Sequence, residues 1–434
     1  MATIRNQKRQ PINQQIDNTK IDKPILIVED SESLAQMLAS LISEQWGCPV
    51  HIAKTYAEAK NYLNKYRYDY LLAICDLTLP DAPNAEIVEL LNKAKVQMIA
   101  ISGNYDPVYV KNIVSKGAVD FIDKNNINAY QYATELVGRL YKNHVIKILV
   151  VDDSDSSSQI VKHMLETQNF QVLVAENGIQ ALQLLDDNQD IKAILTDYAM
   201  PEMDGMELTV KVRESFPKEY VSIIGISGMD SHELSSNFIK NGANDFLVKP
   251  FTYNELLCRV NQNLDMLEYM EHIRNLANLD YMTKVYNRRF FFTQGQEIYQ
   301  SAKDNSTVLT ICMMDIDHFK QVNDNYGHDC GDVILIHFAK TLTEYFSEHL
   351  VARLGGEEFA VLFADMDHQE VISLLNRFRE EISATPIGCG ENSIDITVSI
   401  GAGNILDENI DAMLKRADEN LYQAKETGRN KVIG

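Results

Sequence analysis

Short apolar runs alternate with segments of helical length through the first two thirds of the chain. In residues 24–144 the runs are ILIVE, VHIA, YLLAIC, QMIAIS and VDFID, and in residues 146–268 they are KILVV, QVLVA, AILTD, SIIGIS and NDFLV. This alternation is typical of βαβ units. The pattern therefore predicts two doubly wound parallel sheets of the α/β class, with ligand-binding residues at the carboxyl ends of the strands.

The two segments repeat the same landmarks. The run PILIVED, which ends at Asp30, returns as IKILVVDD, which ends at Asp153. The offsets are 123 from Asp30 to Asp153, 121 from Asp76 to Asp197, 125 from Ser102 to Ser227 and 125 from Lys124 to Lys249. Landmarks that recur at nearly constant offsets indicate a duplicated domain.

Each copy places acids, a serine and a lysine at neighbouring strand ends. They are Glu29, Asp30, Asp76, Ser102 and Lys124 in the first copy and Asp152, Asp153, Asp197, Ser227 and Lys249 in the second. Three carboxylates around one crevice suit Mg²⁺, and an added lysine and hydroxyl suit an aspartate that accepts a phosphoryl group. Acids after strands can also simply cap the next helix, but five positions present twice favour the phosphoacceptor interpretation.

A long helix is predicted from Thr252 to about Asn278, because neither proline nor glycine interrupts this segment. Apolar residues recur every three or four positions, at Leu257, Val260, Leu264, Leu267, Met270, Ile273 and Leu276. The first half of this stripe is expected to pack on its own sheet. The second half is expected to pair with another chain as a short coiled coil.

The last third contains a strand from Val308 to Met314 that ends at Asp315, a helix, and a second helix expected to begin near Asp332. The segment LVARLGGEEFAVLF then predicts a β-hairpin with Glu357 at its tip. Pairing these strands places Asp315 beside Glu357 and Glu358. Divalent cations would offset the repulsion among these carboxylates, and glycines at the turn permit close backbone approach.

The donor atoms at this hairpin indicate which ligand it takes. Carboxylates without histidine or cysteine favour Mg²⁺, which commonly bridges substrate phosphates, so a nucleoside triphosphate is the expected ligand. Two glycines before two acids could also be no more than an exposed hairpin. Calcium is disfavoured because the run NDNYGHDCGD lacks the EF-hand spacing.

Length and composition narrow the function further. A chain of 434 residues suits about three domains, and 45% hydrophobic with 24% charged residues is ordinary for a globular protein. The formal charge of -22 argues against nucleic-acid binding. No apolar stretch approaches the roughly 18 residues of a membrane span, so we expect no membrane insertion and a cytoplasmic protein. Residues 1–23 are polar and are expected to form a flexible tail.

The six cysteines are far apart in the sequence and show no CxxC spacing. They are Cys48, Cys75, Cys258, Cys312, Cys330 and Cys389. This distribution argues against a zinc site, and buried free thiols in a reducing compartment are expected.

These motifs resemble those of a known family: segments 24–144 and 146–268 are similar to the receiver domains of two-component response regulators. The resemblance implies that Asp76 and Asp197 are phosphoacceptors, that each acidic pocket binds Mg²⁺, and that a histidine kinase or phosphotransfer protein is a partner. The second copy has the fuller pattern, with Lys249 followed by proline. The first copy carries Asn84 in the usual glycine position and Asn125 after Lys124. Either aspartate could be the regulated one.

Residues 279–434 resemble the GGDEF diguanylate cyclases. The similarity is carried by RLGGEEF, DYMTKVYNRRFF, DIDHFKQVNDNYGHDCGD and RADENLYQAKETGRN. It implies an α+β domain with a central, largely antiparallel sheet, preceded by a helical linker or coiled coil at 252–278. By position, the implied catalytic and metal-binding set is Asp315, Glu357, Glu358, Lys320 and the carbonyl of Ile316, holding Mg²⁺ or Mn²⁺. The implied substrate-binding set is Asn323 and Asp332 for guanine, with His318, Phe319, Lys320, Lys425 and Arg429 for the phosphates.

The resemblance also implies the reaction, in which two GTP molecules on two facing domains give cyclic di-GMP and pyrophosphate. A homodimer is therefore expected. The family's product-inhibition site usually has an Arg-x-x-Asp motif shortly before the glycine turn, whereas this chain has Phe346 and His349 there. Weak or absent feedback is expected through that site.

The leading hypothesis is thus a response regulator that synthesises cyclic di-GMP under the control of receiver phosphorylation and dimerisation. Two alternatives remain open at this point: a catalytically silent sensor of GTP or cyclic di-GMP, and a phosphorylation-dependent scaffold. The intact set of Asp315, Asn323, Glu357 and Glu358 argues against the silent sensor.

Overall fold

The computed structural model describes residues 20–66, 69–104, 106–228, 232–404 and 409–434. The chain forms two compact units, residues 1–269 and residues 270–434. Most of the tail predicted at residues 1–23 lies outside the described residues. Ile21, near its end, is buried, and its backbone N–H donates to the Trp46 carbonyl.

The first receiver-like domain is a five-stranded parallel sheet with the strand order β2-β1-β3-β4-β5. Its elements are β1 (Ile25–Val28), α1 (Glu32–Trp46), β2 (Val50–Ala53), α2 (Tyr56–Lys65), β3 (Leu72–Asp76), α3 (Glu86–Ala94), β4 (Met98–Ser102), α4 (Pro107–Ser115), β5 (Ala118–Asp123) and α5 (Ala129–Asn143). β1, β3 and β4 are buried along their whole length, because helices pack against both faces of the sheet.

The second receiver-like domain repeats this topology, with the order β7-β6-β8-β9-β10. Its elements are β6 (Lys147–Val151), α6 (Asp155–Glu166), β7 (Gln171–Ala175), α7 (Gly178–Asp187), β8 (Ile191–Asp197), α8 (Gly205–Ser215), β9 (Ser222–Ser227), α9 (His232–Lys240), β10 (Asp245–Val248) and α10 (Tyr253–Asn278). The matching strand order agrees with the repeat seen in the sequence.

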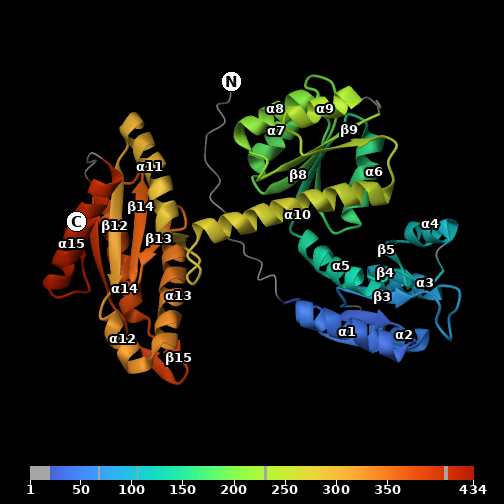
Figure 1. Ribbon diagram of the computed structural model, residues 1–434, viewed down its shortest axis with the longest axis horizontal. Coiled ribbons are helices and arrows are strands. Elements are labelled where there is room, and N and C mark those ends of the chain that lie inside the picture. The colour runs from blue at the N-terminus through green and yellow to red at the C-terminus, as the bar shows by residue number, and fades with distance from the viewer. Residues whose placement is uncertain (1–19, 67–68, 105, 229–231, 405–408) are drawn as a thin grey trace. The chain divides into compact units, whose positions relative to one another are not determined.

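Helix α10 is the long helix that crosses the centre of Figure 1. Its first half packs on the sheet of the second receiver-like domain through Leu256, Leu257, Val260, Leu264 and Leu267. Arg139 of α5 donates to Glu268 of the same helix at 2.7 Å and also contacts Asp265. α10 is therefore bonded to the first receiver-like domain while it packs on the second.

The carboxy-terminal unit has a six-stranded sheet in the order β11-β13-β14-β12-β17-β18. Its elements are β11 (Tyr286–Asn287), α11 (Arg288–Asn305), β12 (Leu309–Ile316), α12 (Phe319–Tyr326), α13 (His328–Tyr345), β13 (Leu350–Gly355), β14 (Glu358–Ala364), α14 (His368–Ala384), β15 (Ile387–Cys389), β16 (Asn392–Ile394), β17 (Val398–Gly403), α15 (Ile410–Glu426) and β18 (Val432–Ile433). The four central strands are antiparallel to one another, whereas the edge strands β11 and β18 are parallel to β13 and β17. The predicted fold class is confirmed for all three domains.

Two apolar cores lie on opposite faces of this sheet. α12, α13 and α14 contribute to one core, and α11 and α15 contribute to the other. The fully buried β12 separates the two cores and carries Asp315 and Ile316 at its carboxyl end. The carboxylate of Asp315 therefore lies at the carboxyl end of a central, buried strand.

Helix α13 begins at His328, four residues before the predicted start near Asp332. Gly327 has a φ of +86° and separates α12 from α13. The run NYGHDCGD contains a second glycine, Gly331, which the sequence pattern could not distinguish from the break. Gly331 is helical and buried, so Asp332 lies inside the helix.

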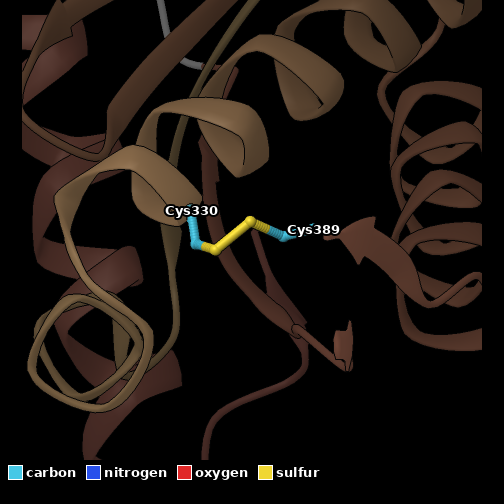
Figure 2. The surroundings of a disulfide bond; sticks show 2 residues. All are labelled: Cys330 and Cys389. Atoms are coloured by element: carbon cyan, nitrogen blue, oxygen red, sulfur yellow. A yellow bond between two sulfur atoms is a disulfide. The ribbon is translucent and has the colours of Figure 1, made fainter. Parts of the chain in front are cut away.

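The expectation of buried free thiols holds for Cys48, Cys75 and Cys312, but it is wrong for Cys330 and Cys389. Cys330 of α13 and Cys389 of β15 form a disulfide, with their Cα atoms 5.7 Å apart, and Figure 2 shows this bond. Cys258 is free but exposed. The two bonded cysteines are separated by 59 residues and are brought together only when the β15–β16 hairpin packs on α13.

Among the described residues, no helix combines the length and the apolar character of a membrane span.

Candidate functional site

The first acidic pocket lies at the carboxyl ends of β1, β3 and β5. Lys124 Nζ lies 2.8 Å from Glu29 Oε2 and 2.7 Å from Asp76 Oδ2, so one ammonium bridges two buried carboxylates. The Thr78 backbone N–H donates to Asp76 Oδ1 at 3.0 Å. Ser102 is buried at the end of β4, and its Oγ accepts from the Asn104 backbone N–H.

Burial and charge act against each other in this pocket. Burial raises the pKa of Glu29, although the bond and the charge of Lys124 oppose the shift and Asp76 adds to it. For Lys124, burial favours the neutral amine, but bonds to Asp76 and Glu29 outweigh it and raise the pKa. The lysine therefore remains charged and compensates the two acids.

Glu29, Asp30 and Asp76 each offer an oxygen within 4.8 Å of the other two. Asp30 is exposed at the rim, while the other two acids are buried. In the part of the chain that the structure describes, this is the one group of three or more acids, thiols or imidazoles that meets this distance. Oxygen donors converging from three sides fit a hard divalent cation such as Mg²⁺.

The second acidic pocket has a similar lysine bridge. Lys249 Nζ lies 2.6 Å from Asp197 Oδ1 and 2.8 Å from Asp152 Oδ2. Asp152 also accepts from the Ser157 hydroxyl at 2.6 Å. Asp153 is exposed, and the three acids of this copy do not meet the 4.8 Å distance found in the first. Ser227 is buried at the end of β9.

The carboxylates of the third domain meet at the end of its central strands. Asp315 on β12 is the register partner of Glu358 on β14 and of Ser399 on β17. Glu357 lies in the turn immediately before β14, next to Glu358. Asp315 is 8% exposed, while the two glutamates are half-buried. The structure thus brings Asp315 beside the glycine turn, as the strand pairing requires.

The turn itself leaves open space. Gly355 and Gly356 have φ values of +151° and +52°, and a Cβ built on either residue would have no other atom within 4 Å. Arg353 braces the turn, because its Nε donates to the Gly356 carbonyl at 2.9 Å and its Nη1 bonds Asp280 at 2.9 Å. A rigid turn with free space above it permits a ligand to approach the backbone closely.

Lys425 of α15 compensates the buried acid at this site. Its Nζ lies 2.8 Å from Asp315 Oδ2. Burial raises the pKa of Asp315, Lys425 opposes the shift, and Glu357 and Glu358 add to it. Three carboxylates and one lysine leave an excess of negative charge, which suits oxygen-coordinated Mg²⁺ or Mn²⁺.

The residues predicted to bind the nucleotide lie at the start of α12, on α12, on α13, at the end of α15 and in the turn after α15. His318, with a φ of +57°, precedes α12, which begins at the buried Phe319 and carries the exposed Lys320. A side chain at Gly331 would overlap Asn323 Oδ1, so the small residue lets α12 and α13 meet. Asn323 and Asp332 consequently lie on adjoining helices, and Arg429 is exposed in the turn before β18.

Sequence reasoning missed two residues that support this arrangement. The first is Arg353, whose link to Asp280 crosses 73 residues of sequence. The second is Asp317, a buried carboxylate that bonds residues 80 to 113 positions away. The DID spacing at Asp315 and Asp317 was the one available signal, because residues two apart on a strand face the same side.

At the position of the expected feedback motif, Phe346 is fully buried among Tyr345, Phe363 and Phe378, and His349 lies against Phe363. Burial lowers the pKa of His349, which favours the neutral imidazole. Neither residue presents a guanidinium or a carboxylate to solvent.

Two family models match this chain. The model "Response regulator receiver domain" matches residues 25–131 and 148–261, and the model "Diguanylate cyclase, GGDEF domain" matches residues 277–431. Each receiver match contains one lysine-bridged pocket. The GGDEF match contains the acidic hairpin.

Individual relatives match parts of the chain. The response regulator PleD of Caulobacter vibrioides is 29% identical over 300 residues, which are 66% of this chain and 65% of that protein. Diguanylate cyclase A of Treponema denticola is 34% identical over 163 residues, 36% of this chain and 44% of that protein. The chain thus spans less than two thirds of the length of either relative.

Among solved structures, a two-component response regulator/GGDEF domain protein is 38% identical, with a TM-score of 0.52. The match covers 57% of this chain and all of that chain.

Proposed function

The chain belongs to the response regulators that carry a GGDEF domain, and on this premise we propose that it is a diguanylate cyclase controlled by its receivers. It joins two GTP molecules into cyclic di-GMP and releases pyrophosphate. The observation that carries the proposal is the position of Asp315, which lies at the end of the central strand beside the open glycine turn.

Each set of residues has a separate task in this proposal. Asp315, Glu357 and the carbonyl of Ile316 hold Mg²⁺ or Mn²⁺, and Glu358 supports them. Asp332 accepts hydrogen bonds from the N–H donors of guanine, and Asn323 hydrogen-bonds the same base. The backbone N–H groups of His318 and Phe319, together with Lys320, Lys425 and Arg429, bind the phosphates. The bound metal lowers the pKa of the attacking 3'-hydroxyl and stabilises charge on the phosphorus.

Two copies of the chain are needed because each domain holds one GTP. The reacting atoms must approach to about 3 to 3.5 Å, which requires two domains to face each other. The carboxy-terminal half of α10 supports a dimer, because its apolar residues are exposed: Met266, Tyr269, Met270, Ile273 and Leu276. A second copy of the helix would cover this stripe as a short coiled coil.

Phosphorylation regulates how often the two domains meet. Asp76 and Asp197 accept the phosphoryl group from a histidine kinase or phosphotransfer protein, with Mg²⁺ in the acidic pockets. Each aspartate is bonded to a lysine that also bonds a second acid, so a new phosphoryl group changes all three partners. Both receiver-like domains contact α10, which gives either one a route to the dimer.

The test is to incubate the purified full-length chain with GTP and Mg²⁺, with and without a small-molecule phosphodonor, and to measure cyclic di-GMP. We expect product that increases when Asp76 or Asp197 is phosphorylated. Glu357→Ala is expected to abolish product while the chain remains folded. Absence of cyclic di-GMP from the wild-type chain under both conditions would exclude the cyclase.

A further inference from the structure

Asp317 is a buried carboxylate that lies between two residues of the proposed active site. It follows Ile316, whose carbonyl is proposed to bind the metal, and precedes His318, whose N–H is proposed to bind phosphate. The side chain is 4% exposed. It therefore cannot bind the nucleotide directly, and its role must come from the residues to which it is hydrogen-bonded.

Both carboxylate oxygens of Asp317 are used inside the domain. The Ser399 hydroxyl donates to Oδ1 at 2.7 Å. The Thr397 hydroxyl donates to Oδ2 at 2.7 Å, and the Asn430 backbone N–H donates to the same oxygen at 3.0 Å. The Asp317 backbone N–H itself donates to the Thr397 carbonyl at 2.9 Å. A buried carboxylate is costly unless its oxygens are hydrogen-bonded, and here three donors satisfy it.

These bonds join three separate segments. Asp317 follows the end of β12, Thr397 and Ser399 lie at the start of β17, and Asn430 lies in the turn between α15 and β18. β12 and β17 are already paired in the sheet. The bond to Asn430 is different, because it ties the end of β12 to a turn outside that strand pair.

The turn at Asn430 has an unusual backbone. Arg429 and Asn430 have φ values of +59° and +45°, and His318 has a φ of +57°. Non-glycine residues adopt this left-handed region at an energetic cost and remain there when surrounding bonds fix them. The Arg429 N–H donates to the Ala424 carbonyl, and Arg379 donates to Asn430 Oδ1 at 3.0 Å. Asp317 supplies the remaining bond and connects this turn to the residue next to His318.

We propose that Asp317 is a positioning residue that fixes the spacing between the His318–Phe319 backbone and the Arg429 side chain, so that both reach the phosphates of one nucleotide. The proposal rests on the proposed cyclase function. Asp317 contacts neither metal nor nucleotide in this role. Its loss affects recognition of the outer phosphates more than recognition of the guanine, because Asn323 and Asp332 are on other elements.

The test compares GTP with GMP, which lacks the outer two phosphates, by calorimetry on the full-length chain with Mg²⁺. Asp317→Ala removes both acceptor oxygens, so the bond from the Asn430 N–H is lost together with those from the Ser399 and Thr397 hydroxyls. We expect the affinity for GTP to fall about tenfold, as for one lost charge-assisted bond, while the affinity for GMP changes less than about twofold. KM for GTP should rise more than kcat falls.

Ser399→Ala is the matched control, because it removes a buried bond to the same carboxylate and leaves the Oδ2 bond to Asn430. It should lower thermal stability without changing the ratio of GTP to GMP affinity. A merely structural Asp317 would instead lower both affinities equally in Asp317→Ala, or neither, and either result overturns the proposal.

A second variant covers the case in which Asp317→Ala does not fold. Asn430→Pro removes the backbone N–H that donates to Asp317. It leaves the Asp317 carboxylate and the hydroxyls of Thr397 and Ser399 unchanged. Proline cannot adopt the positive φ of this turn, so Arg429 is displaced. The same selective loss of GTP affinity is expected, and an unchanged ratio overturns the proposal. Failure of the wild-type chain to bind GTP would contradict the cyclase function itself, which distinguishes the two failures.

Discussion

Lys425 Nζ lies 2.8 Å from Asp315 Oδ2, so a lysine expected at the nucleotide phosphates is bonded to the carboxylate expected at the metal. The ion pair neutralises a buried acid. Binding of Mg²⁺ and GTP would release the lysine from Asp315 toward the phosphates. The pair therefore couples the two halves of the proposed site.

Substituting Lys425 should change metal binding and nucleotide binding in opposite directions. In Lys425→Met we expect Mg²⁺ alone to bind several-fold more tightly, because the competing ammonium is gone, and KM for GTP to rise about tenfold, because a phosphate contact is lost. Calorimetry with Mg²⁺ and steady-state kinetics measure the two effects. Lys415→Met, on an exposed position of the same helix, is the control. Weaker Mg²⁺ binding in Lys425→Met would contradict the exchange.

Removing Lys124 should destabilise the first receiver and make it more dependent on Mg²⁺. Lys124→Met leaves Glu29 and Asp76 buried without their shared cation, which is expected to cost about 1–3 kcal/mol. Trp46, the one tryptophan of the chain, lies in this domain and donates to the Thr134 carbonyl at 2.8 Å, so its fluorescence reports local unfolding. Mg²⁺ should restore more stability to the variant than to the wild type. Lys249→Met should leave the Trp46 transition unchanged.

The first receiver should lose stability when the pH falls through the range below 6.5. His51 stacks on Tyr62 and Tyr66 and bonds Tyr70 Oη at 2.8 Å. Burial, with a smaller contribution from Lys65, lowers the pKa of His51 from its ordinary value of 6.5. The folded domain therefore binds fewer protons than the unfolded chain, so stability is complete above pH 6.5 and declines as the pH falls toward the lowered pKa.

His51→Phe is expected to reduce this pH dependence, since it keeps an aromatic ring and removes the titrating group. Urea unfolding followed by Trp46 fluorescence between pH 5 and about pH 8 would measure it. His144→Gln, at an exposed position, serves as the control. Parallel pH profiles for wild type and His51→Phe would show that His51 does not cause the decline.

Reduction of the Cys330–Cys389 disulfide should destabilise the carboxy-terminal unit. The bond closes a loop of 59 residues of sequence separation, and a cross-link of this size typically contributes about 2–4 kcal/mol. Thermal unfolding of the full chain with and without a dithiol reductant measures the change. Cys330→Ser should reproduce the reduced state and become insensitive to the reductant, whereas Cys258→Ser should behave like the wild type. Equal stability with and without reductant would contradict this expectation.

Cyclic di-GMP should not inhibit the enzyme through the position of the usual feedback motif. Phe346 is fully buried in an aromatic cluster and His349 packs on Phe363, so no charged group faces the product. Initial rates are expected to be unchanged when cyclic di-GMP is added at the start. Phe346→Arg should destabilise the domain rather than create a site, because it buries an unpaired charge. Inhibition that is lost in His349→Ala would contradict the prediction.

The sequence alone determined the parts of the protein that follow from local pattern. Apolar runs of strand length, repeated at offsets near 123, predicted two parallel sheets. They also predicted the strand ends at which Asp76 lies near Lys124 in one copy and Asp197 lies near Lys249 in the other. Two glycines between apolar runs determined the hairpin at Glu357. These features depend on the two-residue period of a strand and on the direction of parallel strands, and both can be deduced from the order of residues.

Only the tertiary structure decided which distant side chains bond to one another. The Asp317–Asn430 bond, the Arg353–Asp280 pair and the Cys330–Cys389 disulfide each join residues at least 59 positions apart, and no spacing rule relates them. Their partners are set by how turns and helices pack around the sheet, and packing depends on the whole core at once. For the same reason Gly327 rather than Gly331 separates α12 from α13, although the local sequence offered both.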